Sequence, residues 1–121
     1  MIKKSNVLNL EDIELRPVKG DSGHINCSFK TLTTDEAGLK FSGVGYQEYG
    51  VGGYAVPHSH EDMEQIFYFL KGKGVMTLGE EEFEVKAGTV VLIPIKTSHS
   101  LRNTGTEPLA HLLFEARVSS K

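Results

Sequence analysis

The chain has 121 residues, of which 39% are hydrophobic and 24% are charged. This length suits one domain, 1–121, and allows a packed apolar core without disulfides. Thirteen Lys and Arg against sixteen Asp and Glu give a net charge of -3, which argues against nucleic acid or an anionic membrane surface as the main partner.

The chain carries no pattern typical of an exported or membrane-bound protein. Its single cysteine, Cys27, excludes an intramolecular disulfide. The first ten residues lack the uninterrupted apolar stretch of a signal peptide. Apolar runs such as Val90–Ile93 are far shorter than the ~20 residues of a membrane span. We therefore expect a cytoplasmic protein that does not contact membranes.

Glycine-bearing turns divide the chain into short strand-like segments, which predicts an all-β sandwich or barrel with little or no helix. Turns are expected at residues 35–38, 50–53, 78–80 and 103–105. Gly72 and Gly74 bracket Lys73 within an otherwise continuous run, which favours a bend or bulge there. In chain order the predicted strands are residues 13–18, 24–32, 39–49, 54–60, 65–70, 74–78, 81–85, 89–93, 99–103 and 110–116.

Two of these predicted strands, residues 65–70 and 89–93, carry apolar side chains on both faces. A lone barrel of this size covers only the inner face of such a strand. We therefore expect a homodimer in which two sheets pack against each other across a two-fold axis.

Candidate chemistry concentrates at His58 and His60, two of the five histidines in the chain. In a strand, residues i and i+2 point the same way, so the two imidazoles can bind a single metal ion. A pair of solvated histidines remains the alternative. The spacing continues on both sides, with Gly52 six positions before His58, Gln65 five positions after His60, and Gly72 seven positions after Gln65.

A second spaced set follows fifteen residues later. Gly88, Pro94, His99 and Asn103 are separated by five, four and three residues. The two sets resemble the motifs of the cupin superfamily, G-x5-H-x-H-x3,4-E-x6-G and G-x5-P-x-G-x2-H-x3-N. The resemblance implies a double-stranded β-helix, the jelly-roll barrel of cupins, with the first motif in residues 52–72, the second in 88–103 and N-terminal strands in 1–50.

The sequence departs from the family pattern at two positions. Lys96 stands where the family has glycine, and because a left-handed lysine costs about 1 to 2 kcal/mol, we expect this turn to take another shape. Gln65 occupies the position of a ligating glutamate by its spacing to His60 and to Gly72. Glu64 fits the shorter spacing from His60 but points to the opposite face unless a bulge intervenes, so Gln65 is favoured and Glu64 stays open.

The resemblance implies one divalent transition-metal ion bound by His58, His60, Gln65 and His99. Three neutral imidazoles and a neutral amide leave such an ion its full +2 charge, which favours an anionic ligand. Imidazole-rich sites suit Zn, Ni, Cu or Fe, with Mn also possible in cupins. The sequence does not choose among these metals.

Other residues are weaker candidates for the site. His24 and His111 lie outside both motifs, and His111 is expected to face away from the apolar layer of its neighbours. Glu61, Asp62 and Glu64 form an acidic loop that is either solvated or the source of a base, and Arg102 either faces solvent or holds an anion. The candidate pocket walls are Tyr46, Glu48, Tyr54, Phe67 and Phe69. Tyr54 and Val56 are placed on the face of the two histidines, whereas ordinary core packing is the alternative for the aromatic residues.

These observations favour a metal-dependent enzyme that acts on a small oxygen-rich molecule by isomerase- or lyase-type proton transfer. A hydroxy acid, keto acid or sugar acid is the expected substrate. The alternatives are a metal-dependent dioxygenase and a module that binds a sugar or acid without turnover. No catalytic acid or base is predicted from the sequence.

Overall fold

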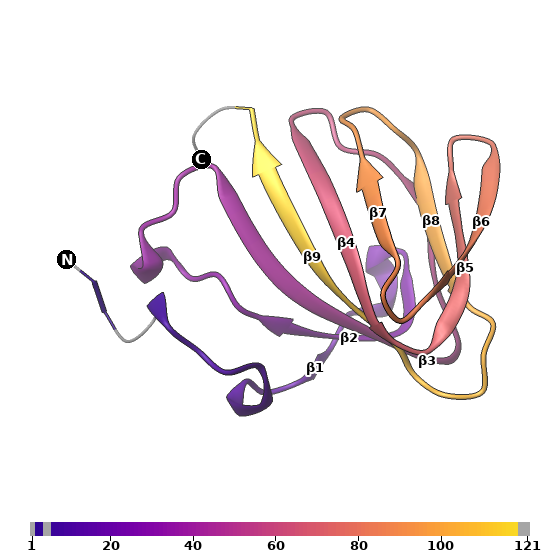
Figure 1. The fold of residues 1–121 in the computed structure, drawn as a ribbon, viewed down its shortest axis with the longest axis horizontal. Helices are drawn as coiled ribbons and strands as arrows, with labels where there is room; N and C mark the ends of the chain where they lie inside the picture. Colours follow the sequence, from indigo (N-terminus) through magenta and orange to yellow (C-terminus); the bar gives the residue numbers. More distant parts are fainter. Residues whose placement is uncertain (1, 4–5, 119–121) are drawn as a thin grey trace.

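The strands form one strongly curled sheet (Figure 1). The computed structural model describes residues 2–3 and 6–118. Short 3-10 turns interrupt the first third of the chain at Leu10–Asp12 (η2), Gly20–Ser22 (η3) and Asp35–Ala37 (η4), and no helix among the described residues is long and apolar enough to cross a membrane. The strands are Arg16–Pro17 (β1), His24–Thr31 (β2), Ser42–His58 (β3), Met63–Lys71 (β4), Lys73–Leu78 (β5), Glu81–Lys86 (β6), Val90–Ile93 (β7), His99–Asn103 (β8) and Leu109–Arg117 (β9).

The order of strands across the sheet is β6-β5-β8-β3-β9-β4-β7, and β2 pairs with both β3 and β1. All these pairings are antiparallel. The sheet curls so that its inner face encloses the core. The largest buried apolar side chains there are Tyr49, Phe67, Phe69, Met76, Leu101 and Leu109. The all-β barrel predicted from the sequence is therefore confirmed.

Strand β3 differs from the prediction, which placed a turn at residues 50–53. The chain instead continues as one strand whose first part pairs with β9 and whose last part pairs with β8. Gly52 has a φ of +80°, and a Cβ on Gly53 would lie only 2.6 Å from the carbonyl oxygen of Asn26. The glycines thus bend the strand around a corner of the barrel rather than reversing it.

The other predicted strands match the structure within about two residues at each end, except the first. Only Arg16 and Pro17 of the predicted 13–18 segment form a strand, which is the short β1. The bend predicted between Gly72 and Gly74 is confirmed, since β4 ends at Lys71, β5 begins at Lys73, and Gly72 has a φ of +81°.

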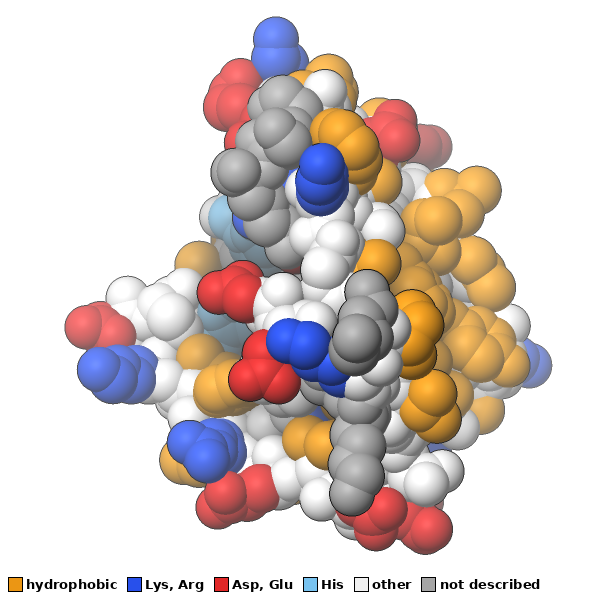
Figure 2. Space-filling model, turned by 90° about the vertical axis from the view of Figure 1, so that its left-hand side faces the viewer, with side chains coloured by type: hydrophobic (Ala, Val, Ile, Leu, Met, Phe, Trp, Pro, Cys, Tyr) orange, Lys and Arg blue, Asp and Glu red, His pale blue; other side chains and the backbone are white. Residues whose placement is uncertain are grey.

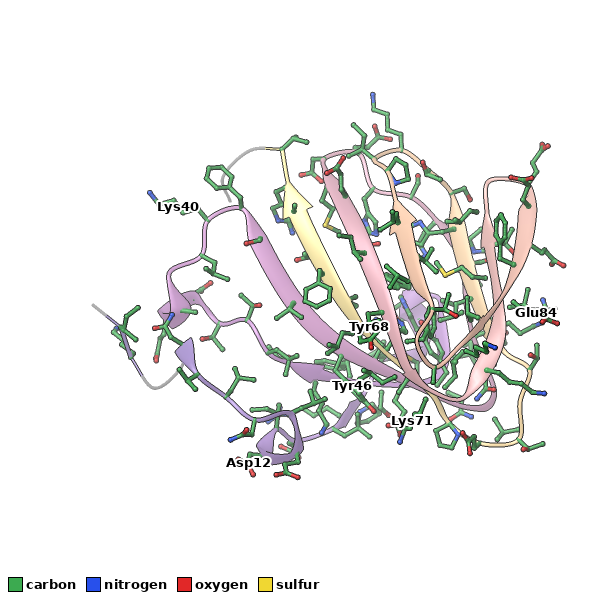
Figure 3. All side chains as sticks on the ribbon, viewed as in Figure 1. Asp12, Lys40, Tyr46, Tyr68, Lys71 and Glu84 are labelled. Atoms are coloured by element: carbon green, nitrogen blue, oxygen red, sulfur yellow. The ribbon has the colours of Figure 1, made fainter. Side chains whose placement is uncertain are left out.

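The two faces of β4 differ sharply in burial. Gln65, Phe67 and Phe69 point into the barrel and are buried, whereas the alternate residues are 36% to 42% exposed. Figure 2 shows hydrophobic side chains gathered on one flank of the molecule, where the outer sides of β4, β7 and β9 lie. We call this surface the outer apolar face, and its members are Ile66, Tyr68 (labelled in Figure 3), Leu70, Val90, Leu92 and Phe114.

Candidate metal centre

Three histidines converge inside the barrel. His58 ends β3, His60 follows it in the next loop, and His99 begins β8 directly opposite His58. Each offers one ring nitrogen, and these nitrogens all lie within 4.8 Å of one another. Among the described residues this is the one group of at least three His, Cys, Asp or Glu placed to hold a metal ion. The two motifs, distant in sequence, therefore meet in one site.

Backbone carbonyls orient two of the rings. Nδ1 of His58 lies 3.0 Å from the oxygen of Val56, and Nδ1 of His99 lies 2.9 Å from the oxygen of Thr97. A carbonyl accepts only, so each Nδ1 carries the proton and leaves the lone pair on Nε2. Nε2 of His60 and Nε2 of His99 are buried without a hydrogen-bond partner. Both atoms are thus available as ligands.

Gln65 faces the histidines and Glu64 does not. Gln65 is 7% exposed and lines the same cavity, and its Oε1 is buried without a partner. Glu64 is exposed on the opposite side of β4. The alternation of a regular strand explains the difference, since no irregularity in the β4 pairing separates residues 63 to 69.

The cavity around these groups has a volume of about 220 Å³. Apolar and aromatic side chains form most of the remaining wall, with a few polar groups between them. Besides the three histidines and Gln65, the cavity is lined by His24, Gln47, Tyr49, Ala55, Phe67, Met76, Ser100, Leu101, Leu113 and Glu115. The site is thus a small, shaped hollow within the barrel.

Burial lowers the pKa of both His60 and His99. The positive form of each imidazole is poorly solvated there, and the neighbouring His58 adds to the effect. For His60, the carboxylates of Glu115 and Asp62 act in the opposite direction. The net result keeps these imidazoles neutral at neutral pH, which is the form that binds a metal ion.

The predicted pocket walls are only partly correct. Phe67 lines the cavity, and Phe69 packs behind it with the ring centroids 6.3 Å apart. Tyr46, labelled in Figure 3, lies outside the cavity, and its hydroxyl donates a hydrogen bond of 2.7 Å to Glu48. The carboxylate of Glu48 in turn lies 3.5 Å from the ammonium group of Lys71. Both predicted wall residues therefore belong to a polar cluster outside the cavity.

The prediction for Tyr54 and Val56 is wrong for a local reason. The pairing of β3 with β8 is irregular between Ala55 and His58. This irregularity shifts the alternation by one residue, so that Ala55 is buried and lines the cavity with His58, while Tyr54 and Val56 are exposed. An uninterrupted strand would have produced the opposite arrangement.

The turn before His99 also differs from expectation. Lys96 keeps the left-handed conformation that the family motif assigns to glycine, with a φ of +59°. Its backbone N–H donates a hydrogen bond of 2.7 Å to the carbonyl of His60. This bond ties the turn to the loop that holds His60, which gives a structural reason for retaining a strained residue there.

The two histidines outside the motifs both lie on the inner side of the barrel. His24, at the start of β2, lines the cavity with its ring centroid 5.8 Å from that of His58. His111 does point away from Ala110 and Phe114, but toward the barrel interior, where it is fully buried and stacked 4.2 Å from Phe67. That burial lowers the pKa of His111 to about 4.

Glu115 is a cavity residue that the motifs did not indicate. It lies on β9 directly opposite Gln65 of β4 and lines the cavity. Its alternation with His111 and Leu113 along β9 is the sequence signal that places it on the inner face. The predicted base candidates 61, 62 and 64 do not line the cavity, and Asp62 instead pairs with Arg117 at 3.6 Å. Arg102 is exposed to solvent.

Known proteins of similar sequence align with parts of the chain. It is 48% identical over 59 residues to an uncharacterized protein of Methanocaldococcus jannaschii, covering 49% of this chain and 47% of that protein. It is 43% identical over 60 residues to a glucose-6-phosphate isomerase of Thermococcus gammatolerans, covering 46% of this chain and 32% of the isomerase. The chain thus spans about half or less of the length of these curated relatives.

The fold itself matches solved structures over almost its full length. The crystal structure of a predicted oxalate decarboxylase from Thermotoga maritima superposes with a TM-score of 0.84 and 25% identity, covering 93% of this chain and 99% of that one. The family model of the Cupin domain matches residues 45–114, a range that includes both motifs. Since this match spans more than half of the chain, the protein belongs to the cupin family.

Proposed function

We propose that His58, His60, Gln65 and His99 bind one divalent transition-metal ion. The observation that carries the proposal is the set of three buried acceptor atoms without a partner, Nε2 of His60, Nε2 of His99 and Oε1 of Gln65. Leaving buried polar atoms unpaired is unfavourable by about 1 to 3 kcal/mol each. A cation shared by these atoms and His58 would satisfy all of them, and imidazole-rich sites suit Zn, Ni, Cu, Fe or Mn.

The charge of the site supports an anionic ligand. The four proposed ligands are neutral, so the ion keeps its +2 charge, and Glu115 on the cavity wall offsets half of it. A residual positive charge favours a carboxylate beside a second oxygen, as in a hydroxy acid, keto acid or sugar acid. The cavity of about 220 Å³ limits the part of the ligand that enters it to a small group.

The reaction we propose is an isomerase- or lyase-type proton transfer. When bound, the ion would act as a Lewis acid that stabilises negative charge developing on a ligand oxygen. Glu115 is the carboxylate on the cavity wall and is proposed to accept the proton at its carboxylate oxygen, while Phe67, Met76 and Leu113 exclude water. The isomerase and the predicted decarboxylase among the similar proteins support this class of chemistry.

Metal analysis and a substrate screen under anaerobic conditions test this proposal. The purified protein should contain one divalent ion per chain. With zinc, in D2O and without oxygen, a keto or hydroxy acid substrate should exchange a proton for deuterium, and Glu115→Gln should abolish the exchange while retaining the metal. Glu64→Gln, on the outside of the barrel, is the matched control and should keep full exchange.

Two other outcomes would replace the proposed reaction. Turnover that requires oxygen and consumes it in step with product would identify the protein as a dioxygenase. Iron or copper bound in the same site would support that reaction. Tight binding of an acid or sugar at the ion, without turnover under either condition, would assign a binding module. A protein that takes up no divalent ion would overturn the metal site itself.

We also propose that a second copy of the chain covers the outer apolar face. This face spans β4, β7 and β9, and its large side chains are 36% to 66% exposed. Exposed apolar surface of this extent marks an interaction site. A sheet face with this much apolar surface can pack against its own copy across a two-fold axis. The expected assembly is therefore a homodimer.

A further inference from the structure

A second hollow along β2 and β3 adjoins the metal cavity. This groove has a volume of about 380 Å³ and shares Gln47, Leu113 and Glu115 with the cavity. These three side chains therefore border both spaces. The combined space is therefore larger than a small chelating acid requires.

Two glycines form the floor of the groove. Gly43 and Gly45 are alternate residues of β3 and lie opposite Glu115 and Leu113 of β9. A Cβ at Gly45 would make only ordinary contacts, the nearest being 3.7 Å from Leu113, and neither glycine has a positive φ. Neither backbone strain nor close packing therefore explains glycine at position 45. Glycine inside a strand is destabilising by roughly 0.5–1 kcal/mol, and it often marks the close approach of a ligand.

The groove walls are mainly apolar. Val18 and Phe29 line it together with Leu113, which also packs against the core. The one cation on the wall, Lys30, already donates a hydrogen bond of 2.7 Å to the carbonyl of Leu10. The negative charge of Glu115 stands at the junction with the cavity and disfavours a second carboxylate there. An uncharged apolar group fits this groove best.

We propose that the natural ligand is a 2-oxo or 2-hydroxy acid with an apolar tail. The acid group would lie in the metal cavity, and the tail would lie along the groove over Gly43 and Gly45. This inference rests on the proposed function, since the metal ion is what would hold the acid group. It adds the substrate class, which neither the motifs nor the cavity alone specifies.

Matched probes test the tail directly. Pyruvate and phenylpyruvate share the same 2-oxo acid group and differ by one phenyl ring. We expect calorimetry on the zinc-loaded protein to show phenylpyruvate binding at least about tenfold more tightly than pyruvate, because the groove buries the ring. This comparison needs no variant, so it stands even if a substitution in the groove disturbs folding.

A larger side chain in the groove should remove the difference in affinity between phenylpyruvate and pyruvate. Gly45→Val should weaken phenylpyruvate binding by about tenfold and change pyruvate binding by less than about twofold, with Gly45→Ala intermediate. Tyr54→Val, an exposed position of the same strand outside the groove, is the control and should change neither. If the Gly45→Val protein still binds phenylpyruvate about tenfold more tightly than pyruvate, the tail does not lie in the groove.

The remaining outcomes separate this inference from the proposed function. Equal affinity for the two probes, in protein shown to hold zinc, would overturn the groove and leave the metal site in place. Binding of neither probe to the zinc-loaded protein would overturn the acid ligand class in both proposals. Phenylpyruvate affinity that is unchanged after removal of zinc with a chelator would overturn the placement of the acid group.

Discussion

The inner and outer faces of strand β4 present opposite physical problems. On the inner face, Gln65 carries a buried oxygen without a partner, beside two histidine nitrogens in the same state. On the outer face, Ile66 and Tyr68 expose apolar surface to solvent. A larger hollow of about 530 Å³, against about 220 Å³ for the metal cavity, is lined by Leu92 and Phe114 of the outer face but also by Gln65 and Glu115. The larger hollow therefore borders on both faces of the strand.

The groups left without a partner on each face indicate what kind of partner that face would bind. Buried lone pairs need a cation or hydrogen-bond donors, whereas exposed apolar surface needs other apolar surface. In Figure 2 histidine is visible on the flank away from the hydrophobic patch. A substitution confined to one face should consequently affect the function of that face much more than the function of the other.

The largest effect is expected from His99→Ala. The substitution removes a buried ligand whose Nε2 has no other partner, so the metal content should fall from about one ion per chain to less than about a tenth, as measured by elemental analysis. His24→Ala is the control, because His24 lines the cavity but lies outside the group of converging nitrogens. Full metal occupancy in the His99→Ala protein would show that the ligand assignment is wrong.

On the outer face, Leu92→Glu should abolish the dimer. Leu92 is 66% exposed, so the substitution leaves an isolated chain almost unaffected but buries an unpaired charge in the proposed interface. We expect the dimer dissociation constant to rise by roughly 100-fold, seen as a monomer mass in light scattering at micromolar concentration. Val51→Glu, exposed on β3 outside this face, should remain dimeric. A monomeric native protein would refute the interface.

The buried His111 should make the stability of the metal-free protein depend on pH. Its pKa falls from 6.5 to about 4 in the fold, so between these values the unfolded chain binds a proton that the folded chain does not. The free energy of unfolding therefore decreases as the pH falls through this window. From about pH 7.5 to about pH 5 the native protein should lose about 2 kcal/mol more than His111→Phe, measured by urea unfolding. Equal losses would contradict the assignment.

The sequence was sufficient to predict the local features of this fold. Strand segments, the bend at Gly72 and the shared face of His58 and His60 depend on short-range patterns. That His99 joins them was implied by the resemblance to the two cupin motifs. The face of β4 that carries Gln65 also followed from simple alternation, because that strand is regular as far as Phe69.

Features that depend on pairing between distant strands and belong to neither motif were missed. The irregularity between Ala55 and His58 reversed the predicted faces of Tyr54 and Val56. His24 reaches the cavity only because β2 places it opposite Ala55 of β3. Glu115 gains its position from its pairing with Gln65. No pattern within a single strand indicates which distant strand it will join, and the cavity wall was therefore predicted less well than the histidines.

The smallest expected effect compares neighbours on opposite faces of β4. Gln65→Ala removes one neutral oxygen from the proposed ligand set, and we expect the metal dissociation constant to rise about tenfold, since three imidazoles remain. Glu64→Ala lies one residue away on the exposed side and should change the constant by less than about twofold. Competition with a metal-binding dye would measure both. A larger effect from Glu64→Ala than from Gln65→Ala would require β4 to present its other face to the ion, which contradicts the burial of Gln65.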